Sequence, residues 1–93
     1  MSTIYATHPR YAEHDYPGHP ENAGRIRAIW RGLDESGLST RMRPLEVQAV
    51  DTEDVLAVHT PAYLDMLRQI NATPRTTFLD ADTYAGPDAL TIA

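Results

Sequence analysis

The sequence contains neither cysteine nor lysine, and it has no long apolar run. Without cysteine there is no disulfide framework and no thiolate metal site. Its apolar runs are a few residues long, far short of the roughly 20 residues that span a membrane. No basic stretch followed by an apolar core opens the chain, so a secretory signal is not expected. We therefore expect a cytoplasmic protein without a membrane partner.

The chain does have the composition of a small folded domain. Its 93 residues are 42% hydrophobic and 23% charged, which is ordinary for a globular protein. Its 13 acids outnumber 8 bases, all arginine, and give a net charge of -5. An acidic surface argues against nucleic acid as the main partner. A chain this short buries roughly two-thirds of its unfolded surface, so its independent stability would be modest.

Strand and helix patterns alternate in the first half of the chain. Residues 3–7 are β-branched and aromatic, which predicts a strand, and residues 8–20 form a polar loop with three prolines. Pro20 or Glu21 is expected to open the first long helix, because proline suits a first turn and an acid complements the helix dipole. Residues 45–49 alternate apolar and polar side chains, as a half-buried strand does.

The second half repeats this alternation. A short helix is expected over residues 53–59, and Thr60 with Pro61 then caps and opens a longer one. A strand over residues 76–79 precedes a polar loop at residues 80–84. The apolar stripe of the longer helix has the helical spacing i, i+3, i+4 and i+7 and consists of Tyr63, Met66, Leu67 and Ile70.

The last helix pattern opens at Pro87 and Asp88 and stops within its apolar face at Ala93. A helix that ends there without a cap or a polar tail indicates a chain that is part of a larger domain. The alternation of strands and helices predicts an α/β fold in which helices pack on a parallel sheet. The few strands expected here would leave the sheet edges bare.

Three histidines stand in the first polar loop, with acids beside them. Imidazole and carboxylate groups are zinc ligands, so a metal site formed by His8, His14 and His19 is one interpretation. The alternative is that these histidines form the hydrogen bonds of loops and turns. No helical i, i+4 pair and no H-x-H spacing fixes a metal geometry, so we expect no metal ligand in this chain.

Arginine and aspartate at three further positions also have two interpretations each. Arg25 borders the apolar stripe of the first helix, where an arginine usually lies at the surface with its stem on the core. An inward guanidinium would instead hold a carboxylate or a carbonyl. Asp80 and Asp82 follow a short strand, where carboxylates either face a ligand crevice or bond their own turn.

Short motifs occur in a definite order along nearly the whole chain. They are His14-Asp15, Gly18-His19-Pro20-Glu21, Arg25-Ile26, Val58-His59-Thr60-Pro61-Ala62-Tyr63-Leu64 and Phe78-Leu79-Asp80-Ala81-Asp82-Thr83. Together they resemble the N-terminal part of the histone deacetylase superfamily, most closely its bacterial deacetylase-like amidohydrolases, acetylpolyamine amidohydrolases and acetoin-utilisation proteins. The resemblance implies an N-terminal fragment of an arginase/deacetylase-type three-layer fold, with a parallel sheet between helix layers. Residues 1–93 would then be a partial, truncated deacetylase domain that holds only the first strands and helices.

The resemblance also implies a reaction. It is the zinc-dependent hydrolysis of an acetyl amide, on lysine or on a polyamine, in which the metal polarises the carbonyl and activates a water. By the same resemblance, His19, Pro20 and Glu21 shape the rim and the wall of the substrate tunnel. The acetylated lysine or polyamine would be the partner of the full-length parent.

The resemblance assigns roles to three further residues and leaves the reacting centre outside the chain. Arg25 lines the pocket through which acetate leaves, and Asp82, or Asp80 in its place, is the rim acid that holds the substrate. The family's tandem catalytic histidines, zinc ligands and transition-state tyrosine lie beyond the matching segment. The chain alone is therefore expected to be inactive and to bind no zinc.

A function of another class stays open on the sequence alone. The chain would then be a free-standing α/β module for interaction or oligomerisation, without catalysis. Its exposed strand edges would pair between copies and give a dimer or a swapped assembly.

Overall fold

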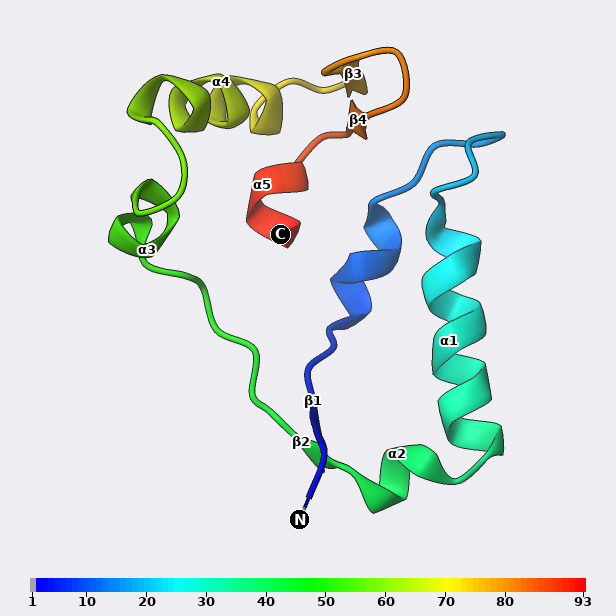
Figure 1. The fold of residues 1–93 in the computed structure, drawn as a ribbon. Helices are drawn as coiled ribbons and strands as arrows, with labels where there is room; N and C mark the ends of the chain where they lie inside the picture. Colours follow the sequence, from blue (N-terminus) through cyan, green and yellow to red (C-terminus); the bar gives the residue numbers. More distant parts are fainter. Residues whose placement is uncertain (1) are drawn as a thin grey trace. The chain divides into compact units, whose positions relative to one another are not determined.

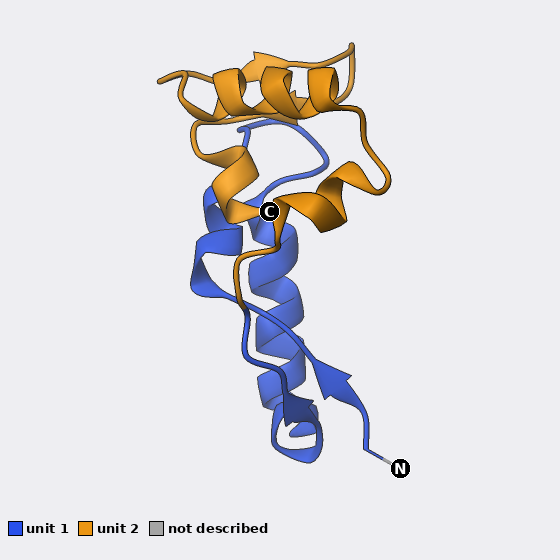
Figure 2. Cartoon of the chain, turned by 90° about the vertical axis from the view of Figure 1, so that its left-hand side faces the viewer, with its two compact units in different colours: residues 1–47 blue, residues 48–93 orange. Residues whose placement is uncertain are grey.

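The computed structural model describes residues 2–93, which divide into two compact units. Unit 1 ends at Val47 and unit 2 runs from Gln48 to Ala93 (Figure 1 and Figure 2). Each unit contains its own helices and its own pair of short strands. No helix within residues 2–93 combines the length and the hydropathy that crossing a membrane requires.

Unit 1 is a parallel strand pair whose strands are joined through helices. It consists of β1 (Ile4–Tyr5), the 3-10 helix η1 (Pro9–Glu13), α1 (Ala23–Glu35), α2 (Leu38–Arg41) and β2 (Arg43–Pro44). The two strands pair in parallel, with Ile4 opposite Arg43. Helix α1 lies alongside η1 and contacts it (Figure 1). This strand–helix–strand order matches the predicted arrangement of helices on a parallel sheet.

The core of unit 1 is small. Of its described residues only Ala23 is buried, and Ile29 of α1 leaves 53% of its surface exposed. Half-buried Trp30 donates from Nε1 to the Thr7 hydroxyl at 2.7 Å, which ties α1 to the segment that follows β1. Hydrogen bonds between elements therefore support unit 1 alongside a modest apolar contribution.

Unit 2 consists of two helices, a hairpin and a final short helix. These elements are α3 (Thr52–Leu56), α4 (Pro61–Asn71), β3 (Thr77–Phe78), β4 (Tyr84–Ala85) and α5 (Ala89–Ile92). The strands β3 and β4 pair antiparallel, with Phe78 opposite Tyr84. Helix α4 packs against α5.

Helix α4 begins as the sequence predicts. The Thr60 hydroxyl accepts a hydrogen bond from the Tyr63 amide at 3.1 Å, and Pro61 occupies the first helical position. The stripe predicted on this helix is wrong in part. Leu64 and Ile70 are buried, whereas Tyr63 and Met66 are each 38% exposed.

The C-terminal end of α4 is held to α5 through one residue. The Asn71 carbonyl accepts from the Asp88 amide at 3.1 Å. The Asn71 side chain accepts from the Thr91 amide at 3.0 Å and donates to the Thr91 hydroxyl at 3.0 Å. These bonds fix α5 against α4. The buried residues of unit 2 are Leu64, Ile70, Tyr84 and Ala85.

One predicted helix start and one predicted strand in the first half of the chain are wrong. Helix α1 begins at Ala23, because Asn22 is extended at φ -148° and caps the helix with its side chain. Pro20 and Glu21 therefore belong to the loop. The strand expected over residues 45–49 is absent, because pairing with β1 takes place at Arg43–Pro44 and no described strand lies opposite the later residues.

The two polar loops are also shorter than predicted. Residues 9–13 of the first loop form η1. Tyr84, expected in the second loop, belongs to β4, and the hairpin closes through the Leu79 amide, which donates to the Thr83 carbonyl at 2.8 Å. The hairpin is antiparallel, so the expectation of a purely parallel arrangement is wrong for these strands.

Candidate functional site

A tight turn fixes the loop that leads into α1. The Tyr16 carbonyl accepts from the His19 amide at 3.1 Å, with Pro17 and Gly18 between them. Gly18 has φ +85°, which is the value that a type II turn requires at its third position. Proline at the second position presets the other dihedral angle. The sequence Pro17-Gly18 therefore determines where the loop places His19.

Two side chains of the loop cap the start of α1. The Asp15 carboxylate accepts from the Ala23 amide at 2.8 Å, and the Asn22 carboxamide oxygen accepts from the Gly24 amide at 2.9 Å. A helix leaves its first amides without backbone partners, so these acceptors satisfy groups that would otherwise need water or a ligand. Asp15 is eight positions from its partner, so this bond also anchors the loop to the helix.

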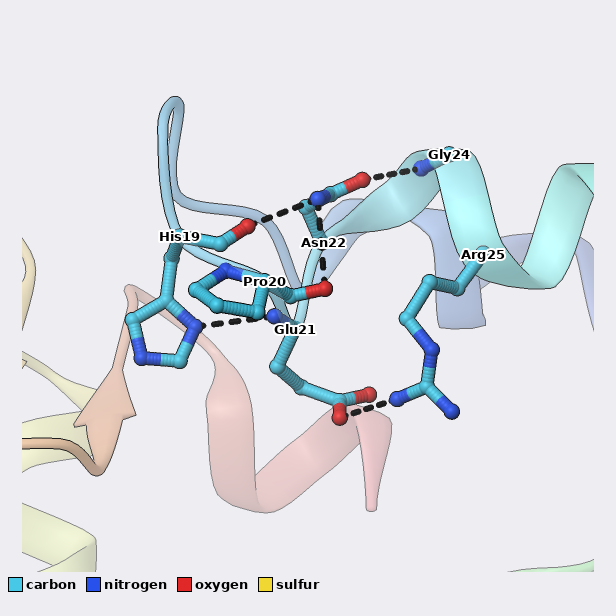
Figure 3. Close-up of polar contacts among 6 residues, drawn as sticks. All are labelled: His19, Pro20, Glu21, Asn22, Gly24 and Arg25. Atoms are coloured by element: carbon cyan, nitrogen blue, oxygen red, sulfur yellow. Dashed lines mark hydrogen bonds and ion pairs between the residues drawn. The ribbon is translucent and has the colours of Figure 1, made fainter.

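The predicted tunnel-wall residues and Arg25 form one polar cluster, which we call the His19–Arg25 cluster: His19, Pro20, Glu21 and Arg25 (Figure 3). Glu21 Oε2 and Arg25 Nη1 form an ion pair, with the two side chains 57% and 58% exposed. Exposed pairs of this kind contribute about 0–1 kcal/mol to stability. The cluster therefore owes its geometry to its loop and helix rather than to this pair.

The His19 ring takes part in the same local network. Its Nδ1 accepts from the Glu21 amide at 2.9 Å (Figure 3). An accepting Nδ1 carries no proton, so in the neutral ring the proton is on Nε2. The bond fixes both the tautomer and the orientation of the ring, as a side chain that lines a binding site requires.

The Asp80 carboxylate is used by its own turn in unit 2. Oδ1 accepts from the Asp82 amide at 2.8 Å, and Oδ2 accepts from the Thr83 hydroxyl at 3.0 Å. The bond from the Asp82 amide, and secondarily that from Thr83, holds the pKa of Asp80 below the ordinary carboxyl value of 3.8. The sequence leaves two interpretations of Asp80 and Asp82, a ligand crevice or hydrogen bonding within their own turn. The second describes the contacts of Asp80. The Asp82 side chain is exposed on the same loop.

The loop histidines do not gather around a common point. His8 Nδ1 accepts from the Arg10 amide at 3.1 Å and caps η1, while His19 bonds the Glu21 amide. Across residues 2–93, no three histidine, aspartate or glutamate side chains stand close enough together to hold a metal ion. The side chains of the described residues 2–93 therefore form no cluster that fits a zinc ion, and His8 and His19 each accept a local backbone hydrogen bond.

Sequence reasoning missed two residues that hold the site. Asn22 caps α1, and this could have been found, since asparagine is among the strongest N-cap residues. Asp15 gave no such signal, because its bond to Ala23 depends on how the turn folds back. The expected site residues also fall in two groups, with the His19–Arg25 cluster in unit 1 and both Asp80 and Asp82 in unit 2.

Comparison with known proteins gives one consistent result. Residues 19–93 match the sequence model of the family described as histone deacetylase domain. A probable deacetylase of Methanothermobacter thermautotrophicus is 36% identical over 85 residues, which are 91% of this chain and 25% of that protein. Human histone deacetylase 7 is 36% identical over 50 residues, which are 54% of this chain and 5% of that protein.

The fold is shared with a solved structure, the HDA15 HD domain. The two structures superpose with a TM-score of 0.85 at 24% sequence identity, and the match covers 96% of this chain and 27% of the solved chain. At this identity the likeness concerns the fold alone, and it confirms the predicted α/β deacetylase-type fold class. Both matches cover nearly all of this chain. The chain spans about a quarter of the length of the Methanothermobacter deacetylase and of the chain of the solved domain.

Proposed function

Because this chain belongs to the histone deacetylase family, we propose that it forms the N-terminal part of a zinc-dependent deacetylase. The full-length protein would hydrolyse an acetyl amide, on lysine or on a polyamine, in the cytoplasm. The chain by itself would be inactive. The observation that carries the proposal is the position of the His19–Arg25 cluster, which stands at the start of the segment, residues 19–93, that matches the family.

The roles proposed for the cluster follow from its chemistry. His19, Pro20 and Glu21 would form part of the wall of the substrate tunnel, where a stiff loop with one oriented imidazole favours a fixed shape. The Arg25 guanidinium, which forms an exposed ion pair with the Glu21 carboxylate, would bind the carboxylate of the acetate product. In unit 2, Asp82, or Asp80 in its place, would be the rim acid that holds the substrate. The Asp80 carboxylate also accepts from the Asp82 amide and the Thr83 hydroxyl.

Zinc would be held by residues of the full-length protein outside this chain. When bound, it would polarise the acetyl carbonyl and activate a water. The residues of this chain would contribute the shape of the site and the binding of the acetyl group and its product. No step of the reaction is assigned to them.

Arg25→Ala in the full-length protein tests the proposal. We expect kcat on an acetyl-lysine peptide or an acetylated polyamine to fall about tenfold or more. The melting temperature should fall by no more than about 4 °C, because the exposed ion pair with Glu21 contributes little stability. Arg68→Ala is the matched control, since Arg68 forms an exposed ion pair with Asp65 on α4. Equal turnover in the two variants would remove the assignment of Arg25.

Self-association through a strand edge is a second proposal, and the hydrogen bonds of β1 favour one edge. The carbonyls of Thr3 and Tyr5 accept from the amides of Arg43 in β2 and of Leu45 just after it, so the backbone groups of Ile4 between them point to the opposite edge. The outer edge of β2 carries Pro44, which has no N–H to donate. The Ile4 side chain is also 51% exposed. We therefore propose that a second copy would pair along β1.

Light scattering of the chain and of two variants tests this pairing. Ile4→Lys places a charge on the open edge and should convert a dimer to a monomer. Leu45→Lys is the control, because Leu45 is similarly exposed at 56% but its amide is bonded to β1. A monomeric parent chain, or equal loss of dimer in both variants, would contradict pairing along β1.

A further inference from the structure

The Asn22 carboxamide forms hydrogen bonds at both of its ends. Its oxygen accepts from the Gly24 amide at 2.9 Å, which caps α1. Its nitrogen donates to the His19 carbonyl at 2.7 Å and, at 3.4 Å, to the Pro20 carbonyl (Figure 3). Capping requires only the oxygen, and aspartate or serine would serve equally well in that role. The nitrogen therefore has a separate task, which is to hold the loop.

The two carbonyls that Asn22 binds belong to the His19–Arg25 cluster. The Pro20 carbonyl belongs to the same peptide group as the Glu21 amide, and the His19 carbonyl is one peptide earlier. The Glu21 amide bonds the His19 ring, and the Glu21 side chain pairs with Arg25. Movement of this short backbone segment would change the His19 ring orientation and the Glu21 position together. Asn22 therefore joins the rigid first turn of α1 to the loop that bears these side chains (Figure 3).

Gly24 has no side chain, which leaves room for the Asn22 carboxamide between the helix and the loop. A Cβ atom on Gly24 would lie 2.8 Å from the Asn22 carboxamide oxygen, closer than van der Waals contact permits. A side chain at position 24 would therefore require the Asn22 carboxamide to shift from its present position. The local sequence Asn22-Ala23-Gly24 thus accommodates a carboxamide held between the helix amide and the loop carbonyls.

We propose that Asn22 is a positioning residue for the His19–Arg25 cluster. Through its amide group it sets the place of His19 and Glu21 on the wall that we assign to the substrate tunnel, and it does so apart from its capping of α1. This inference rests on the proposed function for its catalytic consequence. Its structural part concerns only contacts within unit 1.

Asn22→Asp in the full-length protein separates the two tasks. It keeps the capping oxygen and adds a charge that the helix N-terminus favours. It also replaces the donor to the His19 carbonyl with an oxygen, which repels that carbonyl. Asn22→Ser keeps a capping hydroxyl but is too short to reach the loop carbonyl. It carries no charge, so it shows whether an effect of Asn22→Asp comes from the added charge or from misfolding.

Hydrogen exchange resolved to single amides gives the first readout. In both variants the Gly24 amide should keep its protection, while exchange of the Glu21 amide should quicken about tenfold, as expected when one hydrogen bond is lost. Unchanged exchange at Glu21 would overturn the positioning role whether or not the protein is a deacetylase. Equal loss at Gly24 and Glu21 would also overturn it, since Asn22 would then be a cap alone.

Steady-state kinetics on an acetyl-lysine peptide gives the second readout. We expect KM to rise about tenfold with kcat changed less than about twofold, because a displaced wall weakens substrate and transition state alike. Faster exchange at Glu21 with an unchanged KM would overturn the link to substrate binding. A wild-type protein with no deacetylase activity would overturn the proposed function instead, and the exchange result would still decide whether Asn22 positions the loop.

Discussion

Alanine in place of Gly24 tests the geometry around Asn22 through stability alone. Within a helix, exchange of glycine for alanine normally stabilises by about 0.5–1 kcal/mol. At position 24 the new Cβ would stand 2.8 Å from the Asn22 carboxamide oxygen, so the carboxamide must move. Loss of the cap costs about 1 kcal/mol, and loss of the bond to the His19 carbonyl costs about 1 kcal/mol more. We therefore expect Gly24→Ala to destabilise by about 1 kcal/mol.

Gly32→Ala is the matched control on the same helix. No atom outside its neighbours lies within 4 Å of a Cβ placed there, so only the helix propensity changes. We expect this variant to be more stable than the parent by about 0.5–1 kcal/mol. The two alanine variants should thus differ by about 1.5–2 kcal/mol, with opposite signs relative to the parent chain.

The assay is urea unfolding followed by the fluorescence of Trp30, the one tryptophan in the sequence, which lies on α1. A double-mutant cycle with Asn22→Ala assigns the cause. Once the carboxamide is gone, Gly24→Ala should become stabilising, which corresponds to a coupling energy of about 1.5–2 kcal/mol. If Gly24→Ala stabilises the parent chain as much as Gly32→Ala does, the clash with Asn22 does not exist and the reasoning is wrong.

Three further predictions concern single residues. Gly18→Ala should destabilise by about 1–2 kcal/mol, because φ +85° is strained for alanine although no atom blocks its Cβ; a urea midpoint equal to the parent's would contradict this. Thr60→Ala should cost about 1 kcal/mol through loss of the α4 cap, and Thr60→Ser should restore most of it, as thermal melts by circular dichroism can show. The bond from the Asp82 amide lowers the pKa of Asp80, so the ionised Asp80 carboxylate should stabilise the fold fully above pH 3.8. This stabilisation should be lost as the pH falls through the lower folded pKa of Asp80. An NMR titration of the Asp80 carboxyl with a midpoint at or above 3.8 would contradict this prediction.

The sequence predicts the elements whose signals are local. The cap formed by Thr60 with Pro61 at the first helical position identifies the start of α4 without any tertiary information. The alternation of strands and helices correctly indicates the α/β class that the HDA15 HD domain shares. Pro20 and Glu21 are good first-turn residues and predict too early a start for α1, because the stronger cap, Asn22, sets the start at Ala23.

Elements that depend on distant partners could not be predicted in this way. Residues 45–49 alternate like a strand, but a strand also needs a neighbour, and β1 pairs at Arg43–Pro44 instead. Tyr84 was assigned to a loop because its place in β4 depends on pairing with Phe78. The exposure of Tyr63 and Met66 on α4 likewise depends on what packs against the helix, which periodicity alone does not state.

The candidate site shows the same division. Composition and spacing indicate the loop before α1 as a candidate site. The resemblance to the deacetylase family identifies His19, Glu21 and Arg25 as its candidate residues. The ion pair between Glu21 and Arg25 does not follow from the resemblance, which places Glu21 on the tunnel wall and Arg25 in the acetate pocket. The anchoring bond from Asp15 to Ala23 follows from the path of the folded loop, which the sequence does not specify.

The most direct test of the central claim is a crystal structure of the full-length protein grown with acetate. If this chain supplies one wall of a deacetylase site and Arg25 binds the product, acetate should lie within hydrogen-bond distance of the Arg25 guanidinium, with His19 on the adjoining wall. Acetate bound elsewhere, with Arg25 still paired only to Glu21 and facing solvent, would contradict the account.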